Sequence, residues 1–382
     1  MNPTTPERAT VLIVGAGPAG LRAAQDLAPR VIGNVVVLDR EAQAGGVPRH
    51  SDHLGYGVRD LGRFLTGPTY AKRLVSAAQN AGAEIRTRAM VTGWRDEQTV
   101  EVTSPTGRYA ITADAIVLAT GARERPRSAR WVPGDRAAGV FTTGELQQAV
   151  HVERQRIGTT AVVVGAELVS WSAVLTLAHA GVRTVALLTE YPRADSYGLF
   201  TYPGSLVFRT RVRRRTRVVR VFGRGRIAGV EVEDLDTGTR EQIPCDTVVF
   251  TADWVPDHEL ARSAGLEIDP GTLGPRVDSA LRTARQGVFA AGNLLHPVDT
   301  ADVAALDGVH VAFAVLGHLH GATMPTGAVD ILAAAPLRWV APSRLRPGDP
   351  APPRGRLLAW TDEFIRIPTV TATQDGKRLG RI

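Results

Sequence analysis

Cysteine is almost absent from the sequence, with Cys245 the only one among 382 residues. One cysteine cannot form an internal disulfide, a C-x-x-C dithiol, a four-thiolate iron–sulfur site or a zinc ribbon. The thiol begins an apolar run at 247–250, a position that favours a buried core thiol over a nucleophile. Redox chemistry through a dithiol of this chain is therefore excluded.

Lysine and long apolar runs are also scarce. Nearly all cations are arginine, lysine occurs only at Lys72 and Lys377, and the formal net charge is +7. So strong an arginine bias is typical of a GC-rich genome and does not indicate a nucleic-acid surface. No apolar run approaches the ~20 residues of a membrane span, and residues 1–9 lack the apolar segment of a signal peptide. We expect a cytoplasmic protein with no membrane span and no nucleic-acid partner.

A glycine pattern between a strand and a helix is the most informative feature that is present. An apolar run at 10–14 precedes the pattern G-x-G-x-x-G, and a helical pattern follows at 21–27. Gly15 permits the tight turn, Gly17 lets a pyrophosphate approach the backbone, and Gly20 lets the helix pack on the strand. The helix start also attracts phosphate through its free N–H groups and its dipole.

An acidic residue lies at the distance that this kind of site requires. A second apolar run, 35–38, ends in Asp39, nineteen positions after Gly20. A carboxylate there suits the ribose 2′-hydroxyl of an adenosine without a 2′-phosphate. An ordinary glycine-rich turn does not account for Asp39, so the combination predicts a dinucleotide site.

The rest of the chain alternates strand and helix patterns, which predicts parallel sheets. Helical patterns occupy 67–81 and 300–321, and a second strand–turn–helix unit begins at Thr160, about 150 residues after the first. The repeat suggests two Rossmann-like domains. We expect an α/β fold with two three-layer dinucleotide-binding domains and a short β-rich C-terminal tail, which follows a proline-rich stretch at 342–353.

Four segments together resemble the FAD-dependent pyridine nucleotide–disulfide oxidoreductases, flavoproteins with two dinucleotide-binding domains. They are the glycine pattern at 15–20, Gly45-Gly46, Ala-Thr-Gly-Ala at 119–122 and Gly-Val-Phe-Ala-Ala-Gly-Asn at 287–293. The resemblance implies FAD in a discontinuous first domain. The boundaries that we expect are 8–150 with 250–325 for the FAD domain, 151–249 for the second domain, and 326–382 for the linker and tail.

The resemblance also implies which residues hold FAD. Asn293 departs from the aspartate usual in the family: it keeps an acceptor for the ribityl chain and loses a negative charge. That loss should make the flavin somewhat easier to reduce. The residues expected to bind FAD are Gly15, Gly17, Pro18, Ala19, Gly20, Asp39, Arg40, Gly46, Val91, Thr120, Gly121, Gly292, Asn293, Thr300 and Ala301.

A narrower resemblance is to the FAD subunits of hydrogen cyanide synthases, opine oxidases and dye-linked amino acid dehydrogenases. It is carried by Gly-Gly-Val-Pro-Arg-His at 45–50, Ala-Thr-Gly-Ala-Arg-Glu-Arg-Pro at 119–126, and 291–293 leading into Thr300-Ala301. It implies oxidation of a C–N or C–OH bond of a small molecule, with electrons passed to oxygen, to a dye-like acceptor or to a partner subunit. An NAD(P)H-dependent flavin reductase and an FAD-bearing non-catalytic subunit stay open, as does a homo-oligomer.

The second glycine pattern departs from a working nucleotide site. Glu167 stands where the second glycine should be, and Ser170 stands at the third. A side chain at 167 obstructs the pyrophosphate, and a carboxylate also repels it. We therefore expect an NAD-type site that has lost its ligand. If a nicotinamide nucleotide does bind, Glu190 favours NAD over NADP.

The loop after Gly46 carries the candidates for proton transfer, because in relatives this segment runs beside the flavin ring. Histidine suits the proton transfer that amine oxidation requires, and Arg49 could orient a substrate carboxylate. The alternative is that these side chains only shape the loop and bond to FAD. The catalytic candidates are Arg49, His50 and His53, with Tyr56 beside them and His296 next; the spacing of His310, His318 and His320 supports no metal site.

Overall fold

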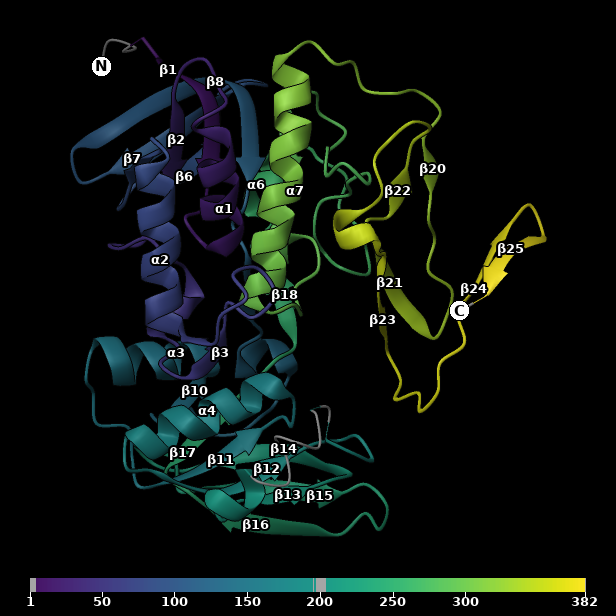
Figure 1. Cartoon of the computed structure of the whole chain (residues 1–382). Coiled ribbons are helices and arrows are strands. Elements are labelled where there is room, and N and C mark those ends of the chain that lie inside the picture. The colour runs from purple at the N-terminus through teal and green to yellow at the C-terminus, as the bar shows by residue number, and fades with distance from the viewer. Residues whose placement is uncertain (1–4, 195, 197–203, 382) are drawn as a thin grey trace.

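The computed structural model describes residues 5–194, 196 and 204–381. Two α/β bodies are stacked one above the other, and a β-rich C-terminal segment lies beside the upper one (Figure 1). The upper body contains the start of the chain and the long helix near residue 310, which are far apart in sequence. This arrangement confirms the α/β fold class with two Rossmann-like units.

The upper body is built on a seven-stranded sheet in the order β5-β2-β1-β8-β7-β6, with β19 paired to β8. Its parallel strands are largely buried on both faces, as expected for strands covered on each side, except for the edge strand β5, which is partly exposed. They are β1 (Glu7–Val14), β2 (Val35–Leu38), β5 (Glu84–Arg86), the second half of β8 (Gly107–Leu118) and β19 (Val288–Ala290). The antiparallel insert consists of β6 (Met90–Trp94), β7 (Thr99–Ser104) and the first half of β8.

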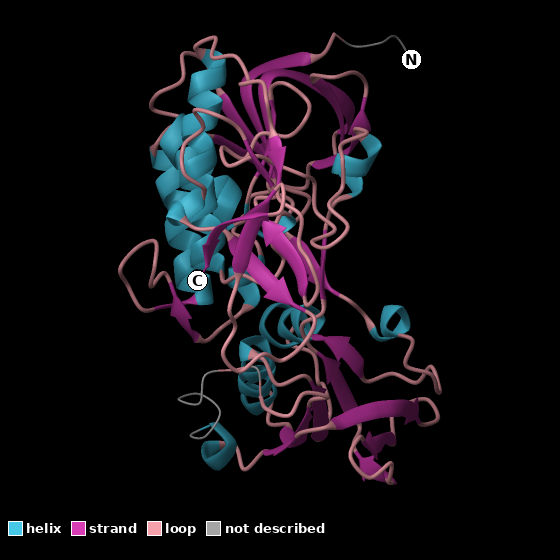
Figure 2. Ribbon diagram, turned by 90° about the vertical axis from the view of Figure 1, so that its right-hand side faces the viewer, coloured by secondary structure: helices cyan, strands magenta, loops and turns pink. Residues whose placement is uncertain are grey.

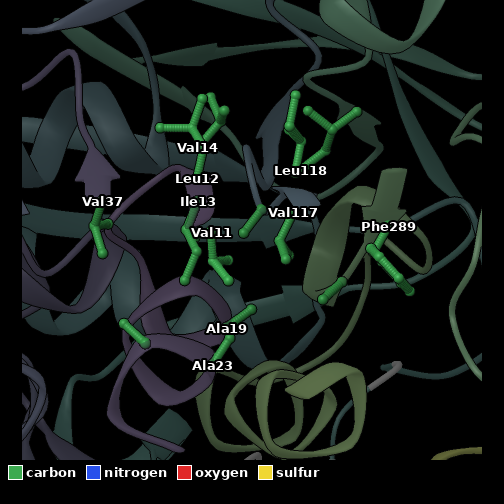
Figure 3. Close-up of a cluster of buried hydrophobic side chains, with 14 of the residues drawn as sticks. Val11, Leu12, Ile13, Val14, Ala19, Ala23, Val37, Val117, Leu118 and Phe289 are labelled. Carbon is green, nitrogen blue, oxygen red and sulfur yellow. The ribbon is translucent and has the colours of Figure 1, made fainter. Parts of the chain in front are cut away.

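Three helices gather on one side of the upper body, and most strands lie on the other (Figure 2). These helices are α1 (Pro18–Leu27), α2 (Gly67–Asn80) and α7 (Ala301–Leu319). The short helix α6 (Glu259–Ser263) lies against the antiparallel insert, where the Trp94 indole donates to the Leu260 carbonyl at 2.9 Å. Val11 and Ile13 of β1 lie on the side where Ala19 and Ala23 of α1 pack (Figure 3). Small side chains on α1 let the helix lie close to the sheet, which brings the glycine turn over the strand ends.

The lower body has a five-stranded parallel sheet in the order β10-β17-β11-β12-β13. An antiparallel three-stranded sheet shares a core with it through Val162 and Val248 on one side and Val221 and Val230 on the other. The parallel strands are β10 (Val140–Thr142), β11 (Thr160–Val164), β12 (Arg183–Leu188), β13 (Arg211–Arg213) and β17 (Thr247–Phe250). The covering sheet is β14 (Thr216–Phe222), β15 (Gly229–Asp234) and β16 (Arg240–Pro244). The helices are α3 (Thr143–Gln147), continued by a π turn at Gln148–Val152, and α4 (Leu168–His179).

The chain crosses between the bodies twice, and both crossings run together. β9 (Ala122–Glu124) leads into the lower body, and β18 (Trp254–Pro256) leads back, paired antiparallel to it. Because β19 then pairs with β8, the upper body is discontinuous, as the fold class predicted. β10 and α3 belong to the lower body, so we propose a first boundary near residue 125 in place of 150.

The C-terminal segment packs on the upper body through short hairpins and ion pairs. Arg346 reaches the buried carboxylate of Asp278, at 3.0 Å, so the stretch at 342–353 is held against the core. The hairpins are β20 (Val329–Asp330) with β22 (Arg344–Leu345), β21 (Leu337–Ala341) with β23 (Leu358–Thr361), and β24 (Thr371–Gln374) with β25 (Lys377–Arg381); the short helix η5 is Pro353–Gly355.

Among the helices of the described residues, α7 is the one long and apolar enough to cross a membrane by length and composition. Its packing is that of a core helix. A Cβ at Gly308 would lie 2.1 Å from the carbonyl oxygen of Ala19, so α7 and α1 are in backbone contact there. We therefore assign α7 to the core of the upper body.

Candidate functional site

The sequence motifs meet at one edge of the upper sheet. Gly15 follows β1, Asp39 follows β2, Thr120 lies two residues after β8, and Gly292 lies two residues after β19. These are the carboxyl ends of parallel strands, where ligands bind in open α/β sheets. Motifs separated by more than 250 residues therefore form one candidate site.

The three glycines of the first pattern differ in what a side chain at each position would contact. Gly15 has φ +109°, and a Cβ there would lie 2.3 Å from the carbonyl oxygen of Ala119. A Cβ at Gly20 would lie 2.0 Å from the carbonyl oxygen of Gly15. A Cβ at Gly17 would meet no atom within 4 Å. Gly15 and Gly20 are thus required by packing, whereas Gly17, with Pro18 and Ala19 after it, faces open space at the start of α1.

The Gly45-Gly46 turn lies against this glycine turn. Gly45 donates its N–H to Ala16, at 2.8 Å, and a Cβ at Gly46 would lie 2.9 Å from Cα of Gly17. The two glycine segments therefore form one cradle around the helix start. This arrangement suits the close approach of a pyrophosphate to the backbone.

Asp39 has a second role that the sequence did not indicate. Its carboxylate accepts N–H bonds from Ala16 and Glu41, each at 2.8 Å, and the side chain is buried. Burial raises the pKa of Asp39, although the two N–H bonds act in the opposite direction. A carboxylate has about four acceptor positions, so two stay available for a ribose. Ala89 donates its N–H to the Asp39 carbonyl at 2.8 Å. This bond places the start of β6, with Val91, near the same edge of the sheet as Asp39.

Asp257 contacts several of the remaining residues at the ADP end of the cradle. It pairs with Arg40 at 3.0 Å and with Arg123, and its carbonyl accepts from Thr120 at 2.7 Å. Its N–H donates to Gly121 at 2.9 Å. Sequence reasoning missed Asp257, since it lies in no glycine pattern and meets these residues only through the crossing β18.

Asn293 marks the flavin end of the cradle. It lies in the short helix η4 (Gly292–Leu294) and donates its amide to the Asp299 carbonyl at 2.9 Å. Its Oδ1 atom is buried and accepts no hydrogen bond from any residue that the structure describes. A Cβ at Gly292 would lie 2.7 Å from Cβ of Ala19, so this turn rests on the start of α1. A buried acceptor without a partner fits a hydroxyl of a ribityl chain.

The start of α7 completes this end. Thr300 precedes Ala301, the first residue of the helix, and its hydroxyl donates to Asp302. Arg59 donates from its backbone to Asp302 at 3.0 Å and from its side chain to Thr300 at 3.2 Å. The cradle at Gly17, the acceptor of Asn293 and the starts of two helices fit FAD, with the pyrophosphate at α1 and the flavin half toward Asn293.

Residues 9–308 match the model of a protein family described as "Pyridine nucleotide-disulphide oxidoreductase". The chain belongs to this family and is an FAD-dependent oxidoreductase. The family resemblance predicted from the glycine segments is thereby confirmed, as is FAD as the cofactor.

Individual relatives carry different names. One of the opine oxidase subunits of Rhizobium meliloti is 27% identical over 321 residues, which cover 74% of this chain and 58% of that protein. Thioredoxin reductase of Treponema pallidum is 27% identical over 298 residues, which cover 74% of this chain and 88% of that protein. The crystal structure of T. acidophilum thioredoxin reductase has a TM-score of 0.68 at 23% identity and covers 81% of this chain and 98% of its own. That likeness shows the fold.

The two loop histidines expected to transfer protons lie inside a buried network. His50 is 4% exposed, its Nδ1 lies 3.3 Å from the side-chain oxygen of Gln147, and burial lowers its pKa to about 4. His53 contacts the Leu54 carbonyl through Nδ1 at 2.8 Å and the Ser172 hydroxyl through Nε2 at 2.6 Å. Burial also lowers the pKa of His53. Both rings are therefore neutral near pH 7 and already bonded to protein.

This network joins the two bodies. The amide of Gln147, at the end of α3, donates to Ser51 at 3.1 Å and to Ser172 of α4 at 2.8 Å. Tyr56 donates its hydroxyl to Ser51 at 2.7 Å. The loop that follows Gly46, with η1 (Val47–His50), β3 (Leu54–Tyr56) and β4 (Leu65–Thr66), is thus held by the lower body. The geometry favours a role for these histidines in shaping the loop.

Arg49 and His296 also have partners. Arg49 lies 3.6 Å from Glu41, on the ADP side of the cradle. His296 lies 2.5 Å from Asp307 through Nε2 and 2.8 Å from Asp299 through Nδ1. Burial alone would lower the pKa of His296, but the two carboxylates outweigh it and raise the pKa. His296 is therefore a buried cation behind η4.

Two histidines of α7 contact backbone carbonyls. His310 lies 2.7 Å from the carbonyl oxygen of Ser279, and His318 lies 3.1 Å from that of Asp114. Within the described ranges no three histidine, cysteine or acidic residues are placed to hold a metal ion. Cys245 is buried, and burial raises its pKa to about 11.

The second glycine pattern is closed by its own side chains. Glu167 is the N-cap of α4, and its carboxylate accepts the N–H of Ser170 in a capping box. The same carboxylate accepts the hydroxyls of Ser170 at 2.7 Å and Thr251 at 3.1 Å. A carboxylate of the chain thus covers the helix start where a phosphate would bind. Glu190 follows β12 and is exposed.

Proposed function

We propose that the protein oxidises a C–N or C–OH bond of a small molecule and passes the electrons to oxygen, to a dye-like acceptor or to a partner subunit. The observation that carries this proposal is the carboxylate of Glu167 on the start of α4. Two relatives support it: the opine oxidase subunit of Rhizobium meliloti, and the alpha subunit of sarcosine oxidase from Corynebacterium, which is 28% identical over 348 residues. A cytoplasmic location stays a prediction from the sequence.

The position of Glu167 argues against NAD(P)H as the electron source. A pyrophosphate at a helix start needs free N–H groups and a positive dipole end. Here the N–H of Ser170 and the hydroxyl of Thr251 already donate to Glu167. A phosphate would have to displace this carboxylate or lie beside a like charge, which costs on the order of several kcal/mol in a partly buried site.

The second candidate is an NAD(P)H-dependent flavin reductase. It is supported by the ferredoxin–NAD(+) reductase subunit of the benzene 1,2-dioxygenase system of Pseudomonas putida, which is 29% identical over 298 residues. The strand and helix around the second pattern are intact, and Glu190 follows β12. The two candidates differ in the direction in which electrons reach the flavin. A third, an FAD subunit without its own catalytic centre, predicts that no small molecule reduces the isolated chain.

Anaerobic bleaching of the flavin decides among these candidates. The holoprotein is mixed with NADH, NADPH, or a panel of amines, amino acids and 2-hydroxy acids, and the absorbance near 450 nm is followed. We expect reduction by a member of the substrate panel and slow or absent reduction by NADH. Fast, saturable reduction of the wild type by micromolar NADH would contradict the proposal and establish the reductase.

A set of variants tests whether Glu167 closes the second site. Glu167→Gly with Ser170→Gly should raise the rate of NADH reduction by about tenfold or more, because the like charge and the side chain are both removed. Glu167→Gln is the matched control, since it keeps the size of the side chain and removes its charge. An equal rate in wild type and the double variant would show that Glu167 is not the cause.

A further inference from the structure

The two crossings between the bodies contain a buried carboxyl group. Glu124 lies at the end of β9, opposite Trp254 of β18, and is 6% exposed. A charged side chain is almost never so buried without a specific partner. Glu124 is not among the residues that the sequence predicts to bind FAD.

Glu124 contacts both the lower body and the return crossing. Its Oε2 accepts the N–H of Gly144, in the first turn of α3, at 3.1 Å, and its Oε1 accepts the N–H of Ala252 at 3.0 Å. Ala252 and Asp253 have φ of 55° and 52°. Non-glycine residues with such φ values are strained and persist where the surroundings hold them.

The geometry points to a positioning role: Glu124 holds α3 and the Ala252–Asp253 turn to the crossings, and thereby fixes the loop beside the flavin end of the cradle. The connection is short. Gln147 lies three residues after Gly144 on α3, and its side chain bonds to His50 and Ser51 of that loop. This inference does not depend on which substrate the protein oxidises.

Among the residues that the structure describes, no cation bonds directly to the Glu124 carboxyl group. Arg130, a cation of the adjacent turn, directs its donors to the carbonyls of Arg125, Thr251 and Ala252 at 2.7–2.9 Å. Burial raises the pKa of Glu124 to about 7; the side chain of Thr143 and the backbone N–H groups near the carboxyl group lower the pKa by less. Charged groups approach Glu124 from every element packed against it. The cations are Arg123 of β9, Arg125 just after that strand, and Arg130 of the short helix η2 (Arg127–Arg130). The carboxylates are Asp253 of the turn, Glu145 of α3 and Glu167 of α4.

The sign of the pH effect follows from the raised pKa. An unfolded glutamate has a pKa of 4.5, so between that pH and about 7 the folded protein keeps a proton that the unfolded chain loses. The stability that this proton contributes is fully present below pH 4.5, is lost progressively as the pH rises to about 7, and falls no further above that pH. Holoprotein should therefore lose thermal stability as the pH rises toward about 7, level off above it, and do so only when Glu124 is present.

The test uses Glu124→Gln, Glu124→Ala and the control Glu259→Gln, each as holoprotein. Glu259 is an exposed glutamate that pairs with Arg123 next to the same crossing. Thermal unfolding from about pH 4.5 to about pH 8.5 and the visible circular dichroism of the flavin are measured. We expect Glu124→Gln to lose the decline in stability below about pH 7, to change the flavin band and to bind FAD about fivefold more weakly.

The control should keep both the decline in stability toward about pH 7 and the flavin band of the wild type. A merely structural role would lower stability at every pH and leave the flavin band unchanged, and that result would overturn the inference. So would a Glu124→Gln protein with the pH profile and flavin band of the wild type. If Glu124→Ala does not fold, the pH profile and flavin band of Glu124→Gln still test the positioning role.

Discussion

At the residue scale, Gly17 separates a ligand requirement from a folding requirement. Its backbone is extended, with φ −82° and ψ −176°, and a Cβ would meet no atom within 4 Å. Gly17→Val should therefore fold with little loss of stability. It should not retain FAD, because a branched side chain would occupy the approach of the pyrophosphate. The measurement is the flavin content of the purified protein with its thermal unfolding.

Gly380→Val is the matched control for this change. Gly380 also has open space around its Cβ and lies in an exposed strand far along the chain from the cradle. It should stay fully yellow. A yellow Gly17→Val protein would show that the pyrophosphate does not lie at this turn.

Residues in the glycine patterns could be predicted because their chemistry is local. A strand, a turn and a helix within twenty residues already define the cradle. Asp257 and Gln147 could not be predicted, since each meets its partners across about a hundred residues or more. His50 and His53 were predicted as catalytic from their place in the loop after Gly46, and that role stays a prediction. Their burial against Gln147 and Ser172 depends on how the two bodies pack, and no pattern in the sequence encodes that packing.

At the scale of elements, the sequence predicted most helices and buried strands because their periodicity is strong. The pattern at 67–81 forms α2, and the pattern at 300–321 forms α7. The extent of β8 was not predicted, because its first half pairs with the antiparallel insert and its second half with the parallel sheet. One strand thus follows two burial patterns, which a single period cannot describe.

The contact between η4 and α7 gives a prediction about pH. His296 is charged in the folded protein between Asp307 and Asp299, with its pKa raised above the ordinary 6.5. The stability from this charge is fully present below pH 6.5 and is lost as the pH rises toward the raised pKa. His296→Gln should lower the stability by about 3–5 kcal/mol at pH 6, as removal of one partner of a buried pair does, and by less at high pH.

Chemical unfolding of the holoprotein at pH 6 and at pH 9 measures this difference. His320→Gln, an exposed histidine just beyond α7, should have no such effect at either pH. Equal destabilisation by His296→Gln at both pH values would mean that His296 is not charged in the folded protein.

At the scale of the whole molecule, the discontinuous upper body explains why the site needs distant parts of the chain. The ADP end is built near residues 15–46 and the flavin end near 292–301, and β8 lies between β1 and β19 in the sheet. The lower body supplies α3 and α4 to the loop after the cradle through Gln147 and Ser172. The division into domains stays a prediction, and the pairing of β10 favours an earlier first boundary.

A buried carboxylate is one of the contacts that attach the C-terminal segment to this assembly, beside the pairs of Arg276 with Asp330 and of Arg344 with Glu267. Asp278 accepts from Arg282 at 2.8 Å and from Arg346 at 3.0 Å, and Arg282 also pairs with Asp349. The rings of Trp339 and Trp360 stack within the segment, with 6.4 Å between their centroids. The segment should therefore be ordered against the upper body and resist proteolysis.

Arg346→Ala should loosen this segment and leave the cradle intact. Asp278 would keep Arg282, so the upper body should stay folded and yellow, while the segment loses a charged hydrogen bond worth about 1.5–3 kcal/mol. Limited digestion with chymotrypsin, followed by mass spectrometry, should show faster cleavage at Trp339 and Trp360. Arg338→Ala, which removes an exposed pair with Asp362, should digest like the wild type. Unchanged cleavage of Arg346→Ala would mean that the hairpins hold the segment without this ion pair.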